Sequence, residues 1–256
     1  MNILTAVLLG IVEGITEFLP VSSTGHLILA QSILGIRQTD FTKTFDMVIQ
    51  LGAILAVGGL YAKKLLTQKN LWLPLVLAFL PTGIFGIILY KPVKQFLLGN
   101  DMVVAVSLFL GGLTIITIER WNTKRQTDSS QTPTNRQALT VGTAQILSFI
   151  PGVSRSAATI AGGMLSGLSR IQAVEFSFLL SVPTMAAAVG YDLVKTSFSL
   201  TPDEIVMIAV GFVFACASAL VTMKSLLAFV KTHSFVPFGW YRIAVALLYG
   251  AFILRG

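Results

Sequence analysis

Two polar clusters interrupt otherwise apolar stretches of this chain, and their residue types suit chemistry on a phosphate group. The first, residues 13–26, reads EGITEFLPVSSTGH, and the second, residues 151–159, reads PGVSRSAAT. Each combines a proline, several hydroxyl side chains and at least one charge. Ionisable side chains inside apolar segments are costly to bury and usually serve a function. The two clusters are therefore the first candidates for a reacting site.

Two carboxylates open the first cluster. Glu13 and Glu17 are four residues apart, so they share one face of a helix. In a low dielectric they repel one another unless a cation, an arginine or a shared proton compensates their charges. The alternative is that both lie near the membrane interface and are merely solvated. The proline, the hydroxyls and the histidine that follow favour a functional pair.

A break in the helix is predicted directly after these carboxylates. Pro20 should end the first half-helix, because the residue before a proline avoids the helical region. Ser22, Ser23 and Thr24 are then expected to cap a second half-helix over residues 25–34. The N-terminus of that half-helix would favour an anion.

The second cluster contributes a cation. Arg155 is the only arginine in the apolar part of either interrupted stretch. Its guanidinium suits bidentate phosphate binding, and the amides of the following helix supply further donors. The alternative is that Arg155 forms a structural salt bridge with Glu13 or Glu17. The two roles can coexist. An anion cradle facing carboxylates, a serine and a histidine suggests phosphoryl transfer.

The composition places these clusters in a membrane protein. The 256 residues are 54% hydrophobic and 11% charged, against about 25% charged in an ordinary soluble domain, and the mean hydropathy is +0.81. This excludes disordered, nucleic-acid-binding and disulfide-stapled secreted proteins, and it argues against a cytosolic enzyme. The net charge of +7 is interpreted as bias between membrane sides. The single cysteine, Cys216, cannot form an intrachain disulfide.

An all-α polytopic architecture follows from the apolar stretches. Six of them are long enough to span a bilayer, at residues 45–61, 71–90, 102–118, 174–194, 204–223 and 238–254. Two further stretches, near residues 1–35 and 138–167, contain the polar clusters. Irregular backbone at membrane depth is tolerated only where protein or water satisfies it. These two stretches are therefore predicted to be re-entrant helix hairpins.

The two halves of the chain are predicted to be inverted repeats within a single membrane domain, residues 1–256. Repeat 1 covers about 1–120, a cytoplasmic linker about 121–136, and repeat 2 about 137–256. Phe18-Leu19-Pro20 matches Phe149-Ile150-Pro151 at an offset of 131, which aligns Ser23 with Ser154. Each half has one hairpin and three spans, so the second half is inverted. Inverted repeats commonly place their site at the repeat interface.

Basic residues indicate the orientation. Ten fall on one predicted side and six on the other, which places the first side in the cytoplasm and both termini outside. The ten are Lys63, Lys64, Lys69, Arg120, Lys124, Arg125, Arg136, Arg170, Lys224 and Lys231, and the six are Arg37, Lys43, Lys91, Lys94, Lys195 and Arg255. Arg155 and Arg242 were not counted because they lie inside apolar segments.

At these residues the sequence resembles the bacterial undecaprenyl-diphosphatase family, also called the bacitracin-resistance or BacA/UppP family. Residues 13–26 resemble its first signature and residues 151–170, PGVSRSAATIAGGMLSGLSR, its second. The resemblance implies an inner-membrane hydrolase, with its active site facing outside, that converts undecaprenyl diphosphate to undecaprenyl phosphate. That product is the lipid carrier recycled for peptidoglycan synthesis. Bacitracin resistance is also implied, since that drug sequesters the diphosphate.

By motif position, the family's functional residues fall on five positions here, namely Glu13, Glu17, Ser23, His26 and Arg155. Our hypothesis is that Ser23 attacks the terminal phosphorus, or positions the attacking group, with His26 as general base and later acid. His26 is three residues after Ser23, so a hydrogen bond between them is expected. The alternative makes His26 the nucleophile and Ser23 a phosphate ligand.

The remaining site residues are expected to bind the substrate or a metal. Arg155, Ser154 and Ser156 would hold the diphosphate, with Ser22 and Thr24 as further ligands. Two carboxylates, Glu13 and Glu17, would bind a divalent cation, Mg²⁺ or Ca²⁺, or tune His26, since hard cations choose carboxylate oxygens.

Two other functions compete with the phosphatase. A lipid-phosphate flippase, alone or combined with the phosphatase, also fits inverted repeats with broken helices. A structural membrane protein whose serines and glycines serve helix packing is the third interpretation. The expected partners are the lipid substrate and the membrane lipid, with a homodimer as a candidate assembly and no nucleic acid.

Overall fold

Local sequence signals set where the helices begin. Asn2, Thr39, Thr134 and Thr201 each form a capping box, in which the cap side chain and the residue three positions later satisfy one another's backbone amides. The computed structural model describes residues 1–97, 100–121, 132–195 and 200–253, and these residues form helices, turns and loops without a strand. The all-α prediction is confirmed for this part of the chain.

Ten α-helices and three short helical turns make up the described chain. In order they are α1 (Ile3–Thr16), α2 (Ser23–Ile33), α3 (Asp40–Thr67), η1 (Lys69–Leu71), α4 (Trp72–Pro92), η2 (Val93–Leu97), α5 (Asp101–Trp121), α6 (Asn135–Gln145), η3 (Ile146–Phe149), α7 (Arg155–Leu165), α8 (Arg170–Lys195), α9 (Pro202–Val230) and α10 (Val236–Ile253). The predicted linker, about 121–136, falls mostly outside the described residues.

Six helical segments of the described chain are long and apolar enough to cross a membrane, which agrees with the predicted number of spans. They are Asp40–Thr67, Lys69–Pro92, Asp101–Trp121, Arg170–Asp192, Pro202–Val230 and Val236–Ile253. The other four helices are shorter. α1 has 14 residues and α2, α6 and α7 have 11 each, or at most about 21 Å against a hydrocarbon core of about 30 Å. None of these four is long enough to span a bilayer alone.

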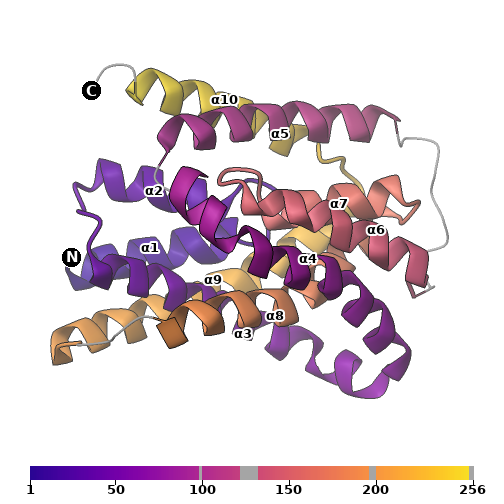
Figure 1. The fold of residues 1–256 in the computed structure, drawn as a ribbon, viewed down its shortest axis with the longest axis horizontal. Coiled ribbons are helices and arrows are strands. Elements are labelled where there is room, and N and C mark those ends of the chain that lie inside the picture. Colours follow the sequence, from indigo (N-terminus) through magenta and orange to yellow (C-terminus); the bar gives the residue numbers. More distant parts are fainter. Residues whose placement is uncertain (98–99, 122–131, 196–199, 254–256) are drawn as a thin grey trace.

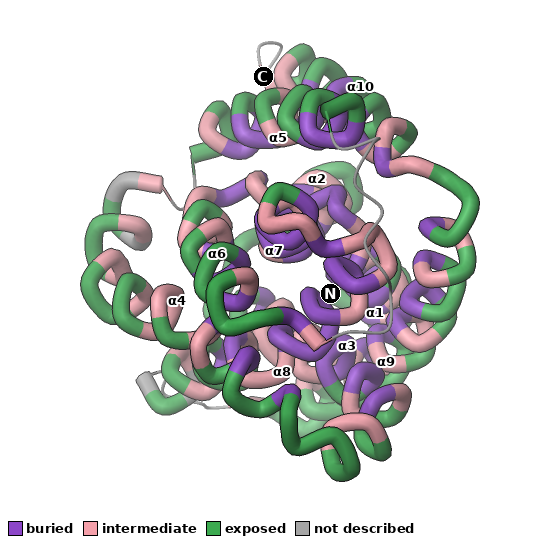
Figure 2. The backbone as a smooth tube through the Cα atoms, turned by 90° about the vertical axis from the view of Figure 1, so that its right-hand side faces the viewer, coloured by how far each residue is buried: buried purple, intermediate pink, exposed green. Residues whose placement is uncertain are grey.

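The short helices form two hairpins at the centre of the molecule. Figure 1 shows α1 and α2 entering from the side where both chain termini lie, and α6 and α7 entering from the opposite side. The end-on view in Figure 2 places α2 and α7 in the interior, with α5 and α10 on one side and α3, α8 and α9 on the other. The two polar breaks therefore meet between the hairpins. Re-entrance into the bilayer remains a prediction, because the structure contains no membrane.

Close backbone contact holds α1 against α9. A Cβ added at Gly10 would overlap the carbonyl of Gly211, and one added at Gly14 would overlap the carbonyl of Ala215. Glycine at these positions lets the two helix backbones approach, as is common between membrane helices. The approach fixes the face of α1 that carries Glu13.

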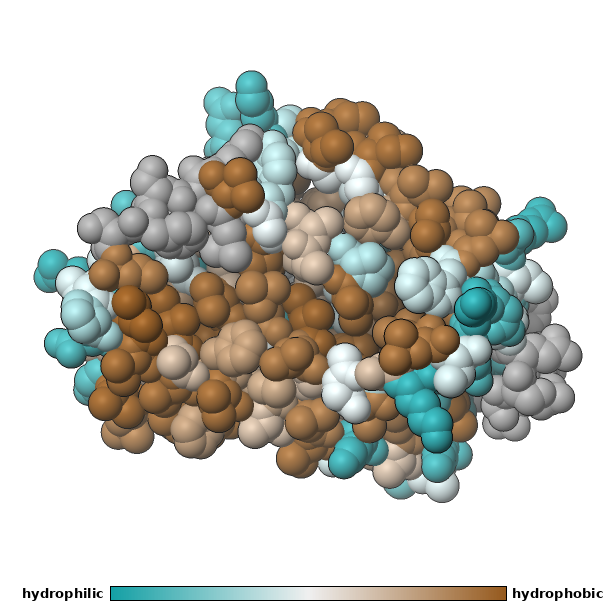
Figure 3. Space-filling model, turned by 90° about the horizontal axis from the view of Figure 1, so that it is seen from below, coloured by the Kyte–Doolittle hydropathy of each residue, from teal (hydrophilic) through white to brown (hydrophobic). Residues whose placement is uncertain are grey.

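Polar contacts connect other helices near their ends. Lys64 of α3 donates to Glu175 of α8 at 2.6 Å, and Tyr249 of α10 donates to Asp101 of α5 at 2.7 Å. Apolar side chains dominate the middle of the face seen in Figure 3, with most hydrophilic residues toward its periphery. This distribution suits a protein surrounded by lipid tails.

Candidate active site

The first polar break begins earlier than the sequence predicted. α1 ends at Thr16 with Glu17 as its C-cap, so the helix stops four residues before Pro20. α2 begins at Ser23 and not at Gly25, and Ser22 is its N-cap, with its Oγ accepting from the amide of Gly25 at 3.4 Å. The expectation that Pro20 ends the helix was therefore wrong. The chain has already turned through residues 17–21 before α2 starts.

The second break repeats this geometry. Ser154 is the N-cap of α7 and accepts from the amide of Ala157 at 3.2 Å. Ser22 and Ser154 both have φ 75, the only non-glycine residues with positive φ in the described chain. Such a conformation is strained for an L-residue and tends to occur at functional sites.

The structural match between the breaks differs by one residue from the predicted alignment. The two N-caps, Ser22 and Ser154, are 132 positions apart, so Ser154 corresponds to Ser22 and not to Ser23. The slip arises because the second break has one more residue between its proline and its cap, and Gly152 there has φ 93. Ser23 and Arg155 consequently hold the same position, the first residue of their helices.

Glu17 joins these two residues. Its Oε2 accepts a hydrogen bond of 2.5 Å from the hydroxyl of Ser23, and its Oε1 accepts one of 3.0 Å from Nη2 of Arg155. The side chains of Arg155 and Glu17 are only 12% and 6% exposed, so the ion pair is shielded from solvent. Its partner is Glu17, one of the two alternatives that the sequence left open.

Arg155 retains one unused donor. Its Nη1 donates to the carbonyl of Ser177 at 2.9 Å, whereas its Nε is buried without a hydrogen-bond partner. Buried polar groups are normally satisfied, so an orphan donor beside a candidate site needs an explanation. An anion at the helix N-terminus would supply the missing acceptor.

His26 does not contact Ser23, so the hydrogen bond expected between them is absent. The ring instead contacts the carbonyl oxygen of Ser22 through Nδ1 at 2.7 Å and the hydroxyl of Tyr241 through Nε2 at 2.7 Å. Ser23 has Glu17 as its hydrogen-bond acceptor, which is the position a general base must occupy. His26 lies on α2, outside the six spans, and burial lowers the pKa of its imidazole.

Three of the other four predicted phosphate ligands form hydrogen bonds within the protein. Ser156 is fully buried and donates its hydroxyl to the carbonyl of Leu19 at 2.7 Å, which ties the two breaks together. Ser154 caps α7 and lies 3.0 Å from the hydroxyl of Ser156. Thr24 is exposed, whereas Ser22 is buried. Thr24 is the most accessible of these four hydroxyls.

Glu13, the second predicted site carboxylate, does not share the hydrogen bonds that join Glu17 to Ser23 and Arg155. It is fully buried, and neither of its carboxylate oxygens has a hydrogen-bond partner in the described chain. Burial, and next the charge of Glu17, hold the pKa of Glu13 well above its usual range. A neutral acid or a bound cation would each resolve this strain.

The donor set fits a cation at Glu13 better than at Glu17. Both oxygens of Glu17 already accept from Ser23 and Arg155. No cluster of three or more His, Cys, Asp or Glu suited to a metal occurs among the described residues. A cation near Glu13 would therefore need oxygens from the substrate or water to complete its coordination, as Mg²⁺ commonly does.

Arg242 is the residue that sequence reasoning missed. It is 0% exposed, and its five N–H groups are directed at five backbone carbonyls and at no carboxylate. The acceptors are Pro20 at 3.1 Å, Gly152 at 2.9 Å, Val153 at 3.0 Å, Ser107 at 3.2 Å and Leu108 at 3.3 Å. Arg242 thus binds the first break, the second break and α5 simultaneously. Its position inside an apolar segment was the sequence signal that could have identified Arg242 as a structurally important residue.

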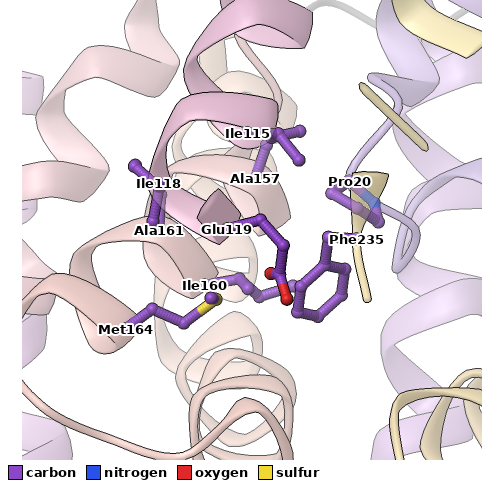
Figure 4. Close-up of a pocket in the computed structure, with 9 residues that line it drawn as sticks. All are labelled: Pro20, Ile115, Ile118, Glu119, Ala157, Ile160, Ala161, Met164 and Phe235. Carbon is purple, nitrogen blue, oxygen red and sulfur yellow. The ribbon is translucent and has the colours of Figure 1, made fainter. Parts of the chain in front are cut away.

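A small pocket lies beside the breaks. It is lined by apolar side chains and by Glu119, and Figure 4 shows the Glu119 carboxyl group directed toward Phe235. Glu119 also pairs with Arg170. The pocket touches the breaks through Pro20 and Ala157 and contains none of the polar groups around Glu17. It is therefore separate from the candidate site.

Comparisons with known proteins cover nearly the whole chain. The family model described as "Bacitracin resistance protein BacA" matches residues 6–248. A protein of Aquifex aeolicus named undecaprenyl-diphosphatase is 51% identical over 251 residues, which is 97% of this chain and 98% of the relative. Proteins of the same name from Thermus thermophilus and Wolinella succinogenes are 48% and 47% identical, over 98% and 97% of this chain and 97% of each relative. Both polar breaks lie inside the matched region.

Proposed function

Since the chain belongs to the bacitracin resistance protein BacA family, we propose that it is an undecaprenyl-diphosphatase of the bacterial cytoplasmic membrane. It hydrolyses undecaprenyl diphosphate to undecaprenyl phosphate and inorganic phosphate, which recycles the carrier for cell-wall synthesis and confers bacitracin resistance. The observation that carries this proposal is the hydrogen-bonded group of Ser23, Glu17 and Arg155. It combines a nucleophile and a cation at two helix N-termini with a base at the C-terminal end of α1.

Ser23 attacks the terminal phosphorus in the first step. The bond from that phosphorus to the bridging oxygen breaks, and the bridging oxygen leaves on undecaprenyl phosphate. The Ser23 proton passes to Oε2 of Glu17, which already accepts its hydrogen bond. This assigns to Glu17 the base role that the sequence had suggested for His26.

Arg155 stabilises the charge on the transferred group. Its Nε is unpartnered, and its pair with Glu17 weakens when Glu17 takes the proton, which frees Nη2 for the phosphate oxygens. The N-terminal amides of α2 and α7 supply further donors. The hydroxyl of Thr24 is the accessible candidate for a further contact to the substrate.

Water cleaves the phosphoserine in the second step. His26 accepts the water proton at Nε2 once the Tyr241 hydroxyl moves away, the remaining hydroxide bonds to phosphorus as the phosphorus–oxygen bond to Ser23 breaks, and Glu17 returns its proton to Ser23. His26 then releases its extra proton to solvent with the phosphate product. A divalent cation bound at Glu13 would neutralise charge on the diphosphate. The family name of the relatives carries the phosphatase function, and no contact in the described chain favours a transport function over it.

We also propose that the site opens outside the cytoplasm and between two inverted repeats. The support is the ten-to-six distribution of basic residues and the matching left-handed caps at Ser22 and Ser154. A homodimer stays a prediction. Labelling of single cysteines, introduced in a Cys216→Ser background near residues 37 and 232, with a membrane-impermeant reagent tests the orientation. Labelling of residue 232 from outside intact cells would contradict it.

Phosphate release from a prenyl diphosphate tests the function directly. We expect the wild-type protein in detergent to release inorganic phosphate and Ser23→Ala to lose most of this activity. Ser32→Ala, an exposed serine on the same helix, is the matched control and should retain it. No phosphate release by wild-type protein would refute the function, and a phosphohistidine at His26 in a mass-mapped trapped enzyme would refute the Ser23 step.

A further inference from the structure

Tyr241 reaches the first polar break from the opposite end of the chain. Its hydroxyl lies 2.7 Å from Nε2 of His26, although the two residues are 215 positions apart. The two rings are nearly parallel, with an interplanar angle of 9° and centroids 5.5 Å apart. Tyr241 is 46% exposed, so solvent or a substrate can reach this side chain.

The two contacts of His26 determine which ring nitrogen carries the proton. The carbonyl oxygen of Ser22 has no proton to donate, so Nδ1, which lies 2.7 Å from it, must be the N–H donor. In a neutral ring Nε2 then presents a lone pair, and the Tyr241 hydroxyl donates to it. Burial lowers the pKa of His26, the hydrogen bond to the Ser22 carbonyl raises it, and the charge of Arg242 lowers it; the net direction is downward and favours the neutral ring.

We propose that Tyr241 is a positioning residue that holds His26 as the neutral Nδ1–H tautomer, in which Nε2 is the unprotonated ring nitrogen. This inference rests on the proposed function, in which Nε2 accepts the proton of the hydrolytic water. Because the hydroxyl donates to the neutral ring only, it stabilises that form against protonation. Tyr241 therefore keeps His26 competent as a base at lower pH.

The groups facing His26 are few, which makes the effect measurable. α10 contributes the Tyr241 hydroxyl and the charge of Arg242, and α2 contributes the Ser22 carbonyl. Loss of one hydrogen bond to the neutral ring should raise the pKa of His26 by about 0.5 to 1 pH unit. Tyr249→Phe is the matched control, since it removes a 2.7 Å tyrosine hydrogen bond from the same helix.

Imidazole ¹⁵N spectra of the full chain test the proposal without reference to activity. The chain has two histidines, and His233→Asn leaves His26 as the only signal. We expect the His233→Asn protein, with Tyr241 in place, to show a protonated Nδ1 and an unprotonated Nε2 at neutral pH. We expect Tyr241→Phe, but not Tyr249→Phe, to raise the His26 pKa and to shift the acid limb of the pH–rate profile upward by the same amount.

Two results would overturn the proposal. One is a protonated Nε2 in a protein that retains Tyr241. This result does not depend on whether a tyrosine variant folds. The other is a Tyr241→Phe protein whose His26 pKa and pH–rate profile equal those of Tyr249→Phe. Failure of the proposed function gives a different pattern. If His26→Gln released phosphate normally while the proteins that keep His26 gave the expected spectra, His26 would have no role in catalysis. Tyr241 would then have no positioning role either.

Discussion

Replacing Arg242 by lysine keeps the positive charge but should still destabilise the protein strongly. A guanidinium has five N–H donors in a fixed fork, whereas an ammonium has three. All five donors of Arg242 meet backbone carbonyls, so lysine leaves at least two carbonyls without a donor. Hydrogen bonds from a charged group contribute about 1.5–3 kcal/mol each, and the lower end applies in membranes. We expect a loss of about 3 kcal/mol.

Unfolding in mixed micelles measures this loss. The protein is titrated with SDS, helicity is followed by circular dichroism, and the free energies of unfolding are compared. Arg170→Lys is the control, because Arg170 meets a single carboxylate oxygen of Glu119 that a lysine ammonium can still contact, and it should cost clearly less than Arg242→Lys. Phosphate release by Arg242→Lys should also fall, since Arg242 sets the spacing between the two breaks. A free energy for Arg242→Lys within about 1 kcal/mol of Arg170→Lys would refute the bracing role.

Three further predictions follow from the same geometry. Gly111→Ala should lower the free energy of unfolding by about 1–3 kcal/mol, because the new Cβ would overlap the Arg242 guanidinium. Gly58→Ala, inside α3 with open space at the new Cβ, should instead raise it by up to about 1 kcal/mol in the same titration, and equal values for the two would contradict the overlap. Glu17→Gln should reduce kcat by about 10²- to 10⁴-fold, measured as phosphate release, and near-normal turnover would exclude Glu17 as the base. Glu13→Gln should weaken activation in a Mg²⁺ or Ca²⁺ titration, and an unchanged titration curve would show that Glu13 holds no cation.

The spans and the polar breaks were predictable because they depend on local sequence. Apolar runs long enough to cross the bilayer identify spanning helices, and each of the six expected runs overlaps one observed segment, although 174–194 and 238–254 extend past the ends of theirs. The pair of Glu17 and Arg155 was one of two alternatives for a buried arginine, since a lone charge in an apolar segment requires a partner. These inferences needed only spacing and residue type.

The contacts of α10 were not predictable, because they depend on tertiary packing. Tyr241 and Arg242 lie 215 or more positions from the first break that they contact, and no local pattern encodes such a distance. The left-handed φ of Ser22 and Ser154 was equally hidden, since serine normally avoids it. The one-residue error in the repeat alignment came from the extra residue between Pro151 and its cap Ser154.

The order of synthesis gives the α10 contacts a consequence for biogenesis. The first signature motif emerges from the ribosome early, but the residues that brace and orient it, Tyr241 and Arg242, belong to α10, more than 200 positions later. A nascent chain with five inserted spans therefore carries its nucleophile without the support that aligns it. Catalytic competence should therefore appear only after α10 docks against α5.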